Sequence, residues 1–188
     1  MVQLRALIQP FEGDVYCHVP IGSSIPVNDF RFAGRGSGNR WNAPGQRTLY
    51  LAHDHAAALA EWARHAAKSY NPDLDPPVQR HMYRLSVAFP AVLDLRDRQV
   101  WEALGGVITE PADFLDVTRC RTMADFARNM TNAVAIHVPS VAFLDDLARG
   151  NLVVFLDKLD DDQGFIHGIA DCGVVGYHPN AVSSTTAS

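Results

Sequence analysis

One run of sequence constrains the fold of this chain more than any other: a glycine-rich loop, a short apolar segment and an alanine-rich segment follow one another over residues 34–70. The loop, GRGSGNRWNAPGQ at 34–46, is dense in glycine, asparagine and proline, which favour turns over regular structure. The segment TLYLA at 48–52 is short and apolar, which is typical of a buried strand. Directly after it, HDHAAALAEWARHAAKSY at 53–70 is rich in alanine and has Asp54 near its start, so we expect a helix. The sequence therefore predicts a structured loop that leads into a strand and then into a helix.

Strand and helix patterns alternate irregularly along the rest of the chain. We expect strands at 14–19, 82–89, 91–95, 133–143 and 152–156, and helices at 101–104 and 119–130. Pro90 separates two of these strands, Pro139 ends another, and Thr118 is the expected N-cap of the last helix. The regular strand–helix spacing of a doubly wound parallel sheet is missing. This pattern favours a single α+β domain.

The composition is that of one globular domain. The chain has 188 residues, of which 47% are hydrophobic and 20% are charged, and this is enough to bury a sizeable core. The net charge is −5 and no run is rich in lysine or arginine. We therefore expect no direct binding to nucleic acid.

The cysteines and the N-terminal residues indicate a reducing, cytoplasmic environment. Cys17, Cys120 and Cys172 are odd in number and widely spaced, so we interpret them as small buried hydrophobes rather than zinc ligands or disulfide partners. The first residues, MVQLRALIQPFEGD, lack the apolar core of a secretory signal. No apolar run approaches the roughly 20 residues that a membrane helix needs, so we expect no membrane association.

The C-terminal part of the sequence has a different character. The segment DKLDDDQG at 157–164 carries four aspartates within six positions and is expected to be a solvated loop. The last residues, NAVSSTTAS at 180–188, are small and polar and are expected to fray. We therefore expect a core domain over residues 1–156 and a C-terminal extension over 157–188 that is partly loop or disordered.

The glycine-rich loop carries arginines that suit an anionic ligand. Arg31, Arg35 and Arg40 lie within ten residues and alternate with glycines. Arginine bonds phosphate oxygens bidentately and exposed backbone N–H groups add to such a site, so the favoured ligand is a pyrophosphate. The loop lacks the Gly-Lys-Ser/Thr of a Walker loop and, unlike a dinucleotide fingerprint, leads into a strand. The alternative is a flexible turn with a solvated basic face.

Glu61 is the second candidate for a functional residue. It lies in the middle of the expected helix, in AAALAEWARHA, where small side chains leave space beside it. In a cleft, its carboxylate would orient a ribose hydroxyl and stabilise the positive charge that develops when a glycosidic bond breaks. The alternative is a surface residue paired with Arg64 or His65.

The histidines near Glu61 do not form a metal motif. His53, His55 and His65 are close to it in sequence, but their spacing is not that of HExxH, so we expect no bound metal. Ser140 does not lie in a GxSxG elbow, so a serine hydrolase is not indicated.

Several further segments occur in a recognisable order. Gly38-Asn39-Arg40-Trp41-Asn42 is followed by Leu49-Tyr50-Leu51-Ala52, then by Glu61, and later by Val138-Pro139-Ser140 and Asn151. This order resembles the RES-domain family, the toxins of bacterial toxin–antitoxin pairs. Members of that family show a Gly-Gly-Arg-Trp-Asn segment, a Leu/Val-Tyr-Leu/Thr-Ala strand and a helix with a glutamate. The resemblance is strong over 31–65, weaker over 80–156 and absent from the tail.

The resemblance implies a fold, a substrate and a partner. RES domains are similar to ADP-ribosyltransferases, mixed α+β domains with a cleft for NAD, so residues 1–156 are expected to form an NAD-binding catalytic domain. The family degrades NAD by phosphorolysis, with inorganic phosphate as co-substrate, or by hydrolysis; the alternative activity is ADP-ribosylation of a protein. The implied partner is an antitoxin with a helix-turn-helix domain that plugs the cleft, and a homodimer is compatible with the resemblance.

The resemblance also assigns roles to individual residues. Glu61 matches the catalytic glutamate, Arg40 and Trp41 match the Arg-Trp step of the loop, and Tyr50 matches the aromatic residue expected near the nicotinamide ring. The serine of the family corresponds either to Thr118 or to Ser140.

One departure from the family pattern concerns the first strand. The family has a Tyr-Arg step there, whose arginine holds NAD, whereas this chain has Tyr16-Cys17-His18. We expect His18, Arg31 or Arg35 to take over that contact. Without such a replacement, the domain would be a catalytically impaired nucleotide-binding module.

Overall fold

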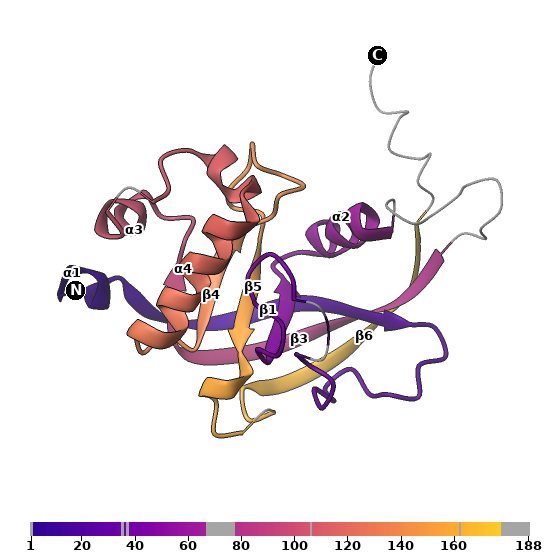
Figure 1. Cartoon of the computed structure of the whole chain (residues 1–188). Helices are drawn as coiled ribbons and strands as arrows, with labels where there is room; N and C mark the ends of the chain where they lie inside the picture. Colours follow the sequence, from indigo (N-terminus) through magenta and orange to yellow (C-terminus); the bar gives the residue numbers. More distant parts are fainter. Residues whose placement is uncertain are drawn as a thin grey trace, which may run out of the picture.

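Two long antiparallel strands, β1 (Ile8–Pro20) and β3 (Val78–Asp94), run along one another and connect the other parts of the sheet. The computed structural model describes residues 2–34, 36, 38–66, 78–105, 107–161 and 163–177, and Figure 1 shows their arrangement. Val15 and Leu85 are partners in this ladder and both are fully buried. Apolar residues at alternate positions therefore give the strand pair a face that packs into the core.

The described residues form a six-stranded sheet in the order β1-β2-β5-β4-β3-β6. The remaining strands are β2 (Thr48–Ala52), β4 (Ala135–Pro139), β5 (Gly150–Phe155) and β6 (Ile166–Tyr177). Because β1 also pairs with β3, the strands β1, β2, β5, β4 and β3 form a closed ring, and β6 lies beside β3 outside it. The β3–β4 pair is parallel and the other pairs are antiparallel. This mixed sheet with a few helices confirms the expected α+β fold class.

Short helices pack against the sheet. They are α1 (Val2–Ala6), α2 (His55–Ala66), α3 (Arg98–Ala103) and α4 (Val117–Met130), with the 3-10 turns η1 (Pro111–Leu115) and η2 (Leu156–Lys158). In Figure 1, α4 lies against β4 and β5, whereas α2 lies near the C-terminal end of β1. Within the described residues, no helix combines the length and the apolar character needed to cross a membrane.

Strands β4 and β5 lie in the middle of the fold and are buried on both faces. Ile136 and Val153 are partners in the ladder and pack with Phe114 on the side of α4. Leu152 packs on the other side with Leu85 of β3. Complete burial of such aliphatic side chains stabilises the fold by about 1.5–3 kcal/mol each. Their near-continuous apolar sequence follows from this double burial.

Strand β3 corrects the expectation of two strands separated by Pro90. It runs without interruption from Val78 to Asp94. The β1–β3 register shifts between Gln9 and Phe11, opposite Pro90, so the proline lies where the ladder is irregular. A proline cannot donate a ladder hydrogen bond, and this irregularity accommodates it without ending the strand.

The N-cap of α4 is a second correction. The expected cap was Thr118, but the helix begins at Val117 and its N-cap is Asp116. The Asp116 carboxylate accepts hydrogen bonds from the backbone N–H groups of Thr118 and Arg119, at 2.9 and 3.1 Å. Two otherwise unpaired donors of the first turn are satisfied in this way, so Thr118 belongs to the helix itself.

The C-terminal segment contributes a strand that the sequence did not predict. The expected domain boundary at residue 156 lies just beyond β5, and β6 follows and pairs with β3 from Val87 to Val78. The expected frayed tail at 180–188 and residues 67–70 of the expected helix lie outside the described residues. Among the cysteines, Cys120 is buried and Cys17 is partly buried, but Cys172 on β6 is exposed, contrary to expectation.

The close approach of β4 and β5 gives a test of the fold. A Cβ atom at Gly150 would collide with the carbonyl oxygen of Val138, whereas one at Gly176 on β6 would meet open space. We expect Gly150→Ala to lower the free energy of unfolding by about 1–3 kcal/mol, as overpacking does. Gly176→Ala, the matched control, should change it little. Urea unfolding measures both, and equal losses would contradict this strand packing.

Candidate active site

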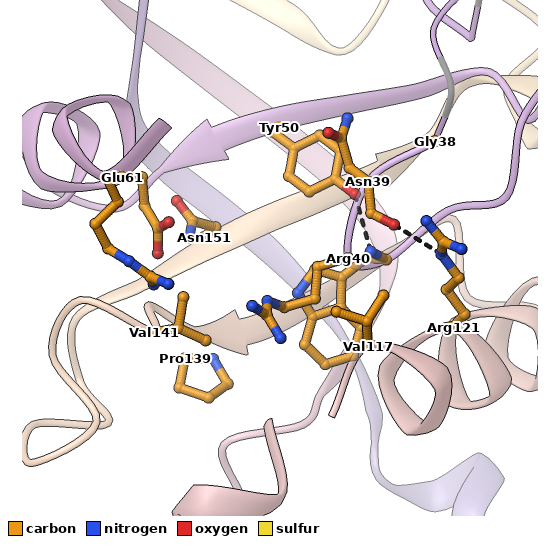
Figure 2. A pocket seen from close by; sticks show the side chains of 12 residues that line it. Gly38, Asn39, Arg40, Tyr50, Glu61, Val117, Arg121, Pro139, Val141 and Asn151 are labelled. Atoms are coloured by element: carbon orange, nitrogen blue, oxygen red, sulfur yellow. Dashed lines mark hydrogen bonds between the residues drawn. The ribbon is translucent and has the colours of Figure 1, made fainter. Parts of the chain in front are cut away.

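A cavity of about 490 Å³ lies between the glycine-rich loop, α2 and the N-terminal part of α4. We call it the arginine cavity because three of the described residues that line it are arginines. The lining residues are Gly38, Asn39, Arg40, Trp41, Tyr50, Glu61, Arg64, Val117, Arg121, Pro139, Val141 and Asn151. Figure 2 shows Glu61 on one side of the cavity and Arg40 and Arg121 on the other. Residues far apart in the sequence therefore face one space.

A second hollow, of about 450 Å³, continues from the arginine cavity. We call it the aromatic hollow, because Tyr16, His18, Phe30, Phe32 and Trp62 contribute to its walls. Tyr50, Glu61 and Asn151 line both spaces and therefore mark their junction. The volume of each space falls within the roughly 300–1,000 Å³ range of small-molecule sites.

The Glu61 carboxylate is held at this junction by Ser140. The Ser140 hydroxyl donates a hydrogen bond of 2.6 Å to Oε1 of Glu61 and accepts one of 3.2 Å from the backbone N–H of Ala142. Ser140 is completely buried at the end of β4. This buried hydroxyl, at the end of β4, therefore fixes the orientation of a carboxylate on α2, a different part of the chain. In Figure 2, the carboxylate points toward Asn151.

Hydrogen bonds to Tyr50 fix the glycine-rich loop. The Tyr50 hydroxyl accepts a bond of 3.1 Å from the Trp41 backbone N–H and donates one of 2.8 Å to Oδ1 of Asn42. Burial raises the pKa of this hydroxyl, so it remains protonated and able to donate. The loop is also anchored to α4, because Gln46 donates to the Asp125 carboxylate at 2.7 Å. The loop is therefore part of the rigid wall of the cavity.

Two of the three arginines of the cavity are oriented by backbone carbonyls. Arg40 Nη1 donates to the carbonyl oxygens of Phe114 and Leu115, at 2.8 and 2.9 Å. Arg121 Nε donates to the Asn39 carbonyl at 2.9 Å, which leaves its terminal nitrogens for a ligand. These bonds pre-orient two guanidinium groups toward one cavity, which favours an anionic ligand.

The structure brings some of the residues predicted from the sequence together and separates others. Arg40, Trp41, Tyr50 and Glu61 line the arginine cavity, His18 lines the aromatic hollow, and Ser140 contacts Glu61. Arg31 lines neither space, because it pairs with Asp29 and its side chain is 76% exposed. Thr118 is exposed on α4 outside both linings, and Arg35 lies outside the described residues.

Arg64 and Arg121 line the cavity but are not predicted as site residues from the sequence. The sequence suggests Arg64 only as a surface partner of Glu61, although its position one helical turn further on places both on the same face of α2. Arg121 lies on α4, far from the loop in sequence, and carries no local signal. Within the described part of the chain, no group of three histidines, cysteines or carboxylates is arranged to hold a metal ion.

Comparisons with known proteins agree with this fold. The family model described as RES domain matches residues 20–166. A solved structure from M. tuberculosis, the MbcT–MbcA toxin–antitoxin complex, contains a chain that is similar to this one with a TM-score of 0.64 and 22% sequence identity. The similarity covers 95% of this chain and 92% of that chain. A search of curated proteins gave no match. At this level of identity, the structural likeness shows the fold.

Two glycines of the loop test how tightly it is packed. Gly38 and Gly45 both have a φ of 85°, so alanine would be strained by about 1–2 kcal/mol at either position. A Cβ atom at Gly38 would lie 2.7 Å from the Asn42 carbonyl oxygen, whereas one at Gly45 would meet nothing within 4 Å. We expect Gly38→Ala to cost about 1–3 kcal/mol more than Gly45→Ala in urea unfolding. Similar losses for the two variants would mean that the loop is loosely packed.

Proposed function

Because the chain belongs to the RES domain family, we propose that it is the toxin of a toxin–antitoxin pair and cleaves the bond between nicotinamide and ribose in NAD. The observation that carries this proposal is the position of Glu61, held by Ser140 where the arginine cavity meets the aromatic hollow. This arrangement suits a ligand with an anionic part, an aromatic part and a reactive bond between them.

The two spaces differ in the chemistry of their walls. Arg40 and Arg121 offer guanidinium groups to the arginine cavity, which suits the pyrophosphate of NAD. Aromatic side chains surround the other space and provide apolar surface and ring faces for a flat heteroaromatic ring. We place the nicotinamide in the aromatic hollow and the pyrophosphate in the arginine cavity. The ribose joined to nicotinamide then lies beside Glu61.

The proposed reaction begins with stretching of the C–N bond. The bonding electron pair moves to the pyridinium nitrogen, so nicotinamide leaves as a neutral molecule and requires no general acid. Positive charge develops on the ribose, and the Glu61 carboxylate stabilises it electrostatically. The Ser140 hydroxyl keeps Oε1 of Glu61 in place, so the carboxylate needs little reorganisation during the reaction. Water or inorganic phosphate then attacks the ribose carbon, and an attacking water loses its proton to the solvent.

Replacement of Glu61 tests this assignment. We expect Glu61→Gln to reduce nicotinamide release from NAD by about 100-fold or more, because the neutral amide cannot stabilise the developing cation. The fold should be retained, because the amide occupies nearly the same volume. Glu102→Gln, at an exposed position of α3, is the matched control and should leave the rate unchanged. The measurement is the release of nicotinamide by purified protein.

Three outcomes distinguish the related activities. Free ADP-ribose indicates hydrolysis, and ADP-ribose 1-phosphate that forms only with inorganic phosphate indicates phosphorolysis. Radiolabel from NAD that remains on protein indicates ADP-ribosylation of a macromolecule.

Unchanged nicotinamide release by Glu61→Gln would overturn the role of Glu61. Expression of the wild-type chain alone should lower cellular NAD and arrest growth, and Glu61→Gln should do neither.

The arginines give a separate test of pyrophosphate binding. We expect Arg121→Met and Arg64→Met each to raise KM for NAD about tenfold, because a hydrogen bond to a charged group contributes about 1.5–3 kcal/mol. The matched control is Arg98→Met on α3, whose guanidinium lies over the Trp101 ring away from the site. Steady-state kinetics measure KM and kcat separately. A fall in kcat without a change in KM would show that these arginines do not bind the ground state.

We also propose that a cognate antitoxin with a helix-turn-helix domain closes the cleft. Both rims carry exposed apolar side chains that a partner would cover. Leu115 and Val117 are 52% and 39% exposed beside the arginine cavity, and Ile25 and Phe32 are 40% and 46% exposed at the aromatic hollow. Exposed apolar side chains that gather on one face can mark a protein interaction site.

A further inference from the structure

A histidine in the wall of the aromatic hollow is hydrogen-bonded to an arginine that the proposed chemistry does not use. His18 lies on β1 and lines the hollow. Arg80 lies on the neighbouring strand β3, where it is the partner of Pro20, and its Nε donates a hydrogen bond of 3.0 Å to Nδ1 of His18. This bond joins two residues that are 62 positions apart.

This hydrogen bond defines the tautomer of the histidine. An imidazole whose Nδ1 accepts a hydrogen bond carries its proton on Nε2 in the neutral form. The ring edge opposite Arg80 is therefore a hydrogen-bond donor. Because His18 lines the hollow and its other nitrogen is engaged by Arg80, the geometry points to Nε2–H as the atom available to a ligand.

Burial, together with the nearby positive charge of Arg80, keeps the His18 ring neutral. Arg80 faces it from β3, while Glu61 from α2, Asp29 from the loop after β1, and Cys17 from β1 line the same hollow. Burial, followed by the positive charge of Arg80, lowers the pKa of His18 to about 4. At neutral pH the histidine is an uncharged donor.

A tryptophan completes the arrangement. The Trp62 ring lies 6.0 Å from the His18 ring, edge to face, and the Arg80 guanidinium lies 6.0 Å from the centroid of the Trp62 ring. Both contacts lie within the range of aromatic and cation–π interactions. Trp62 directly follows Glu61 on α2, and His18, Glu61 and Trp62 all line the aromatic hollow.

We propose that Arg80 is a positioning residue that holds His18 as an Nε2–H donor in the wall of the aromatic hollow, and that this donor binds a neutral acceptor on the substrate ring, such as a carboxamide oxygen. The substrate half of this inference rests on the proposed function, whereas the state of His18 does not. Arg80 acts through His18, and it contributes no contact to the substrate.

The state of His18 is tested in the free protein by nitrogen-detected NMR of the histidine rings. In the wild-type protein, His18 should have an unprotonated Nδ1 and a protonated Nε2, and should not titrate above about pH 5, because its depressed pKa keeps the ring neutral there. In Arg80→Met, the pKa should rise and both tautomers should appear. The control is Arg84→Met. Arg84 lies on the same strand as Arg80 and pairs with the exposed Asp14, so its replacement should leave His18 unchanged. A wild-type ring with a protonated Nδ1 would overturn the proposal, whatever the enzyme does to NAD.

The consequence for the substrate is tested by kinetics. We expect Arg80→Met to raise KM for NAD about tenfold, because one well-placed hydrogen bond is lost, and to change kcat by about twofold or less. Arg80→Lys should recover part of this loss, because its ammonium can also donate to Nδ1. His18→Phe should raise KM as much as the double variant with Arg80→Met, since Arg80 acts through His18. Additive increases in KM in the double variant would overturn the proposal that Arg80 acts through His18.

The acceptor on the substrate ring is tested with two inhibitors. Nicotinamide and 3-methylpyridine share the pyridine ring, but 3-methylpyridine lacks the carboxamide. Wild-type protein should prefer nicotinamide, and His18→Phe should lose that preference. A preference that persists in His18→Phe would show that another group binds the carboxamide. If NAD is not cleaved at all, the proposed function fails, and the NMR experiment still decides the positioning role of Arg80.

Discussion

The hydrogen bond from Ser140 to Glu61 is the interaction on which the site depends. It joins α2 to the end of β4 and fixes a carboxylate between two cavities of different chemistry. Ser140 is itself held, because its backbone N–H donates to the Arg149 carbonyl at 2.9 Å and its side chain is completely buried. A freely rotating glutamate on a helix surface would sample many orientations, and only a few of them face the junction. The buried serine therefore converts a common surface residue into a defined electrostatic element.

Four of the residues that the sequence predicts for the site share a short stretch of chain. Arg40, Trp41, Tyr50 and Glu61 belong to one loop–strand–helix run, so local patterns and a family resemblance sufficed to group them. Ser140 was one of two candidates, and only tertiary structure separates it from Thr118. Arg121 could not be found in this way, because it reaches the cavity from α4 after a long intervening segment. Its role depends on how α4 packs against the ring of strands, which no local pattern reports.

The fold was predictable to a similar extent and for similar reasons. The fold class, the strand at 48–52 and the presence of a helix after it follow from composition and periodicity. The continuity of β3 through Pro90 does not, because it depends on an irregularity in the β1–β3 pairing at the proline. Strand β6 also escaped detection, since its glycines and exposed positions weaken the strand pattern. In each case the deciding contact lies on another segment of the chain.

Neighbouring strands of the closed ring are paired over very different lengths. Among the described residues, β1 and β2 meet through the Tyr16–Ala52 pair, whereas β1–β3 and β2–β5 are joined by longer ladders. Tyr16 and Ala52 both line the aromatic hollow, so the shortest strand pairing of the ring lies in the wall of that hollow. Parting of this pair would widen the hollow while the two longer ladders stayed intact. The width of the aromatic hollow is therefore governed by the weakest pairing in the ring of strands, the one between β1 and β2.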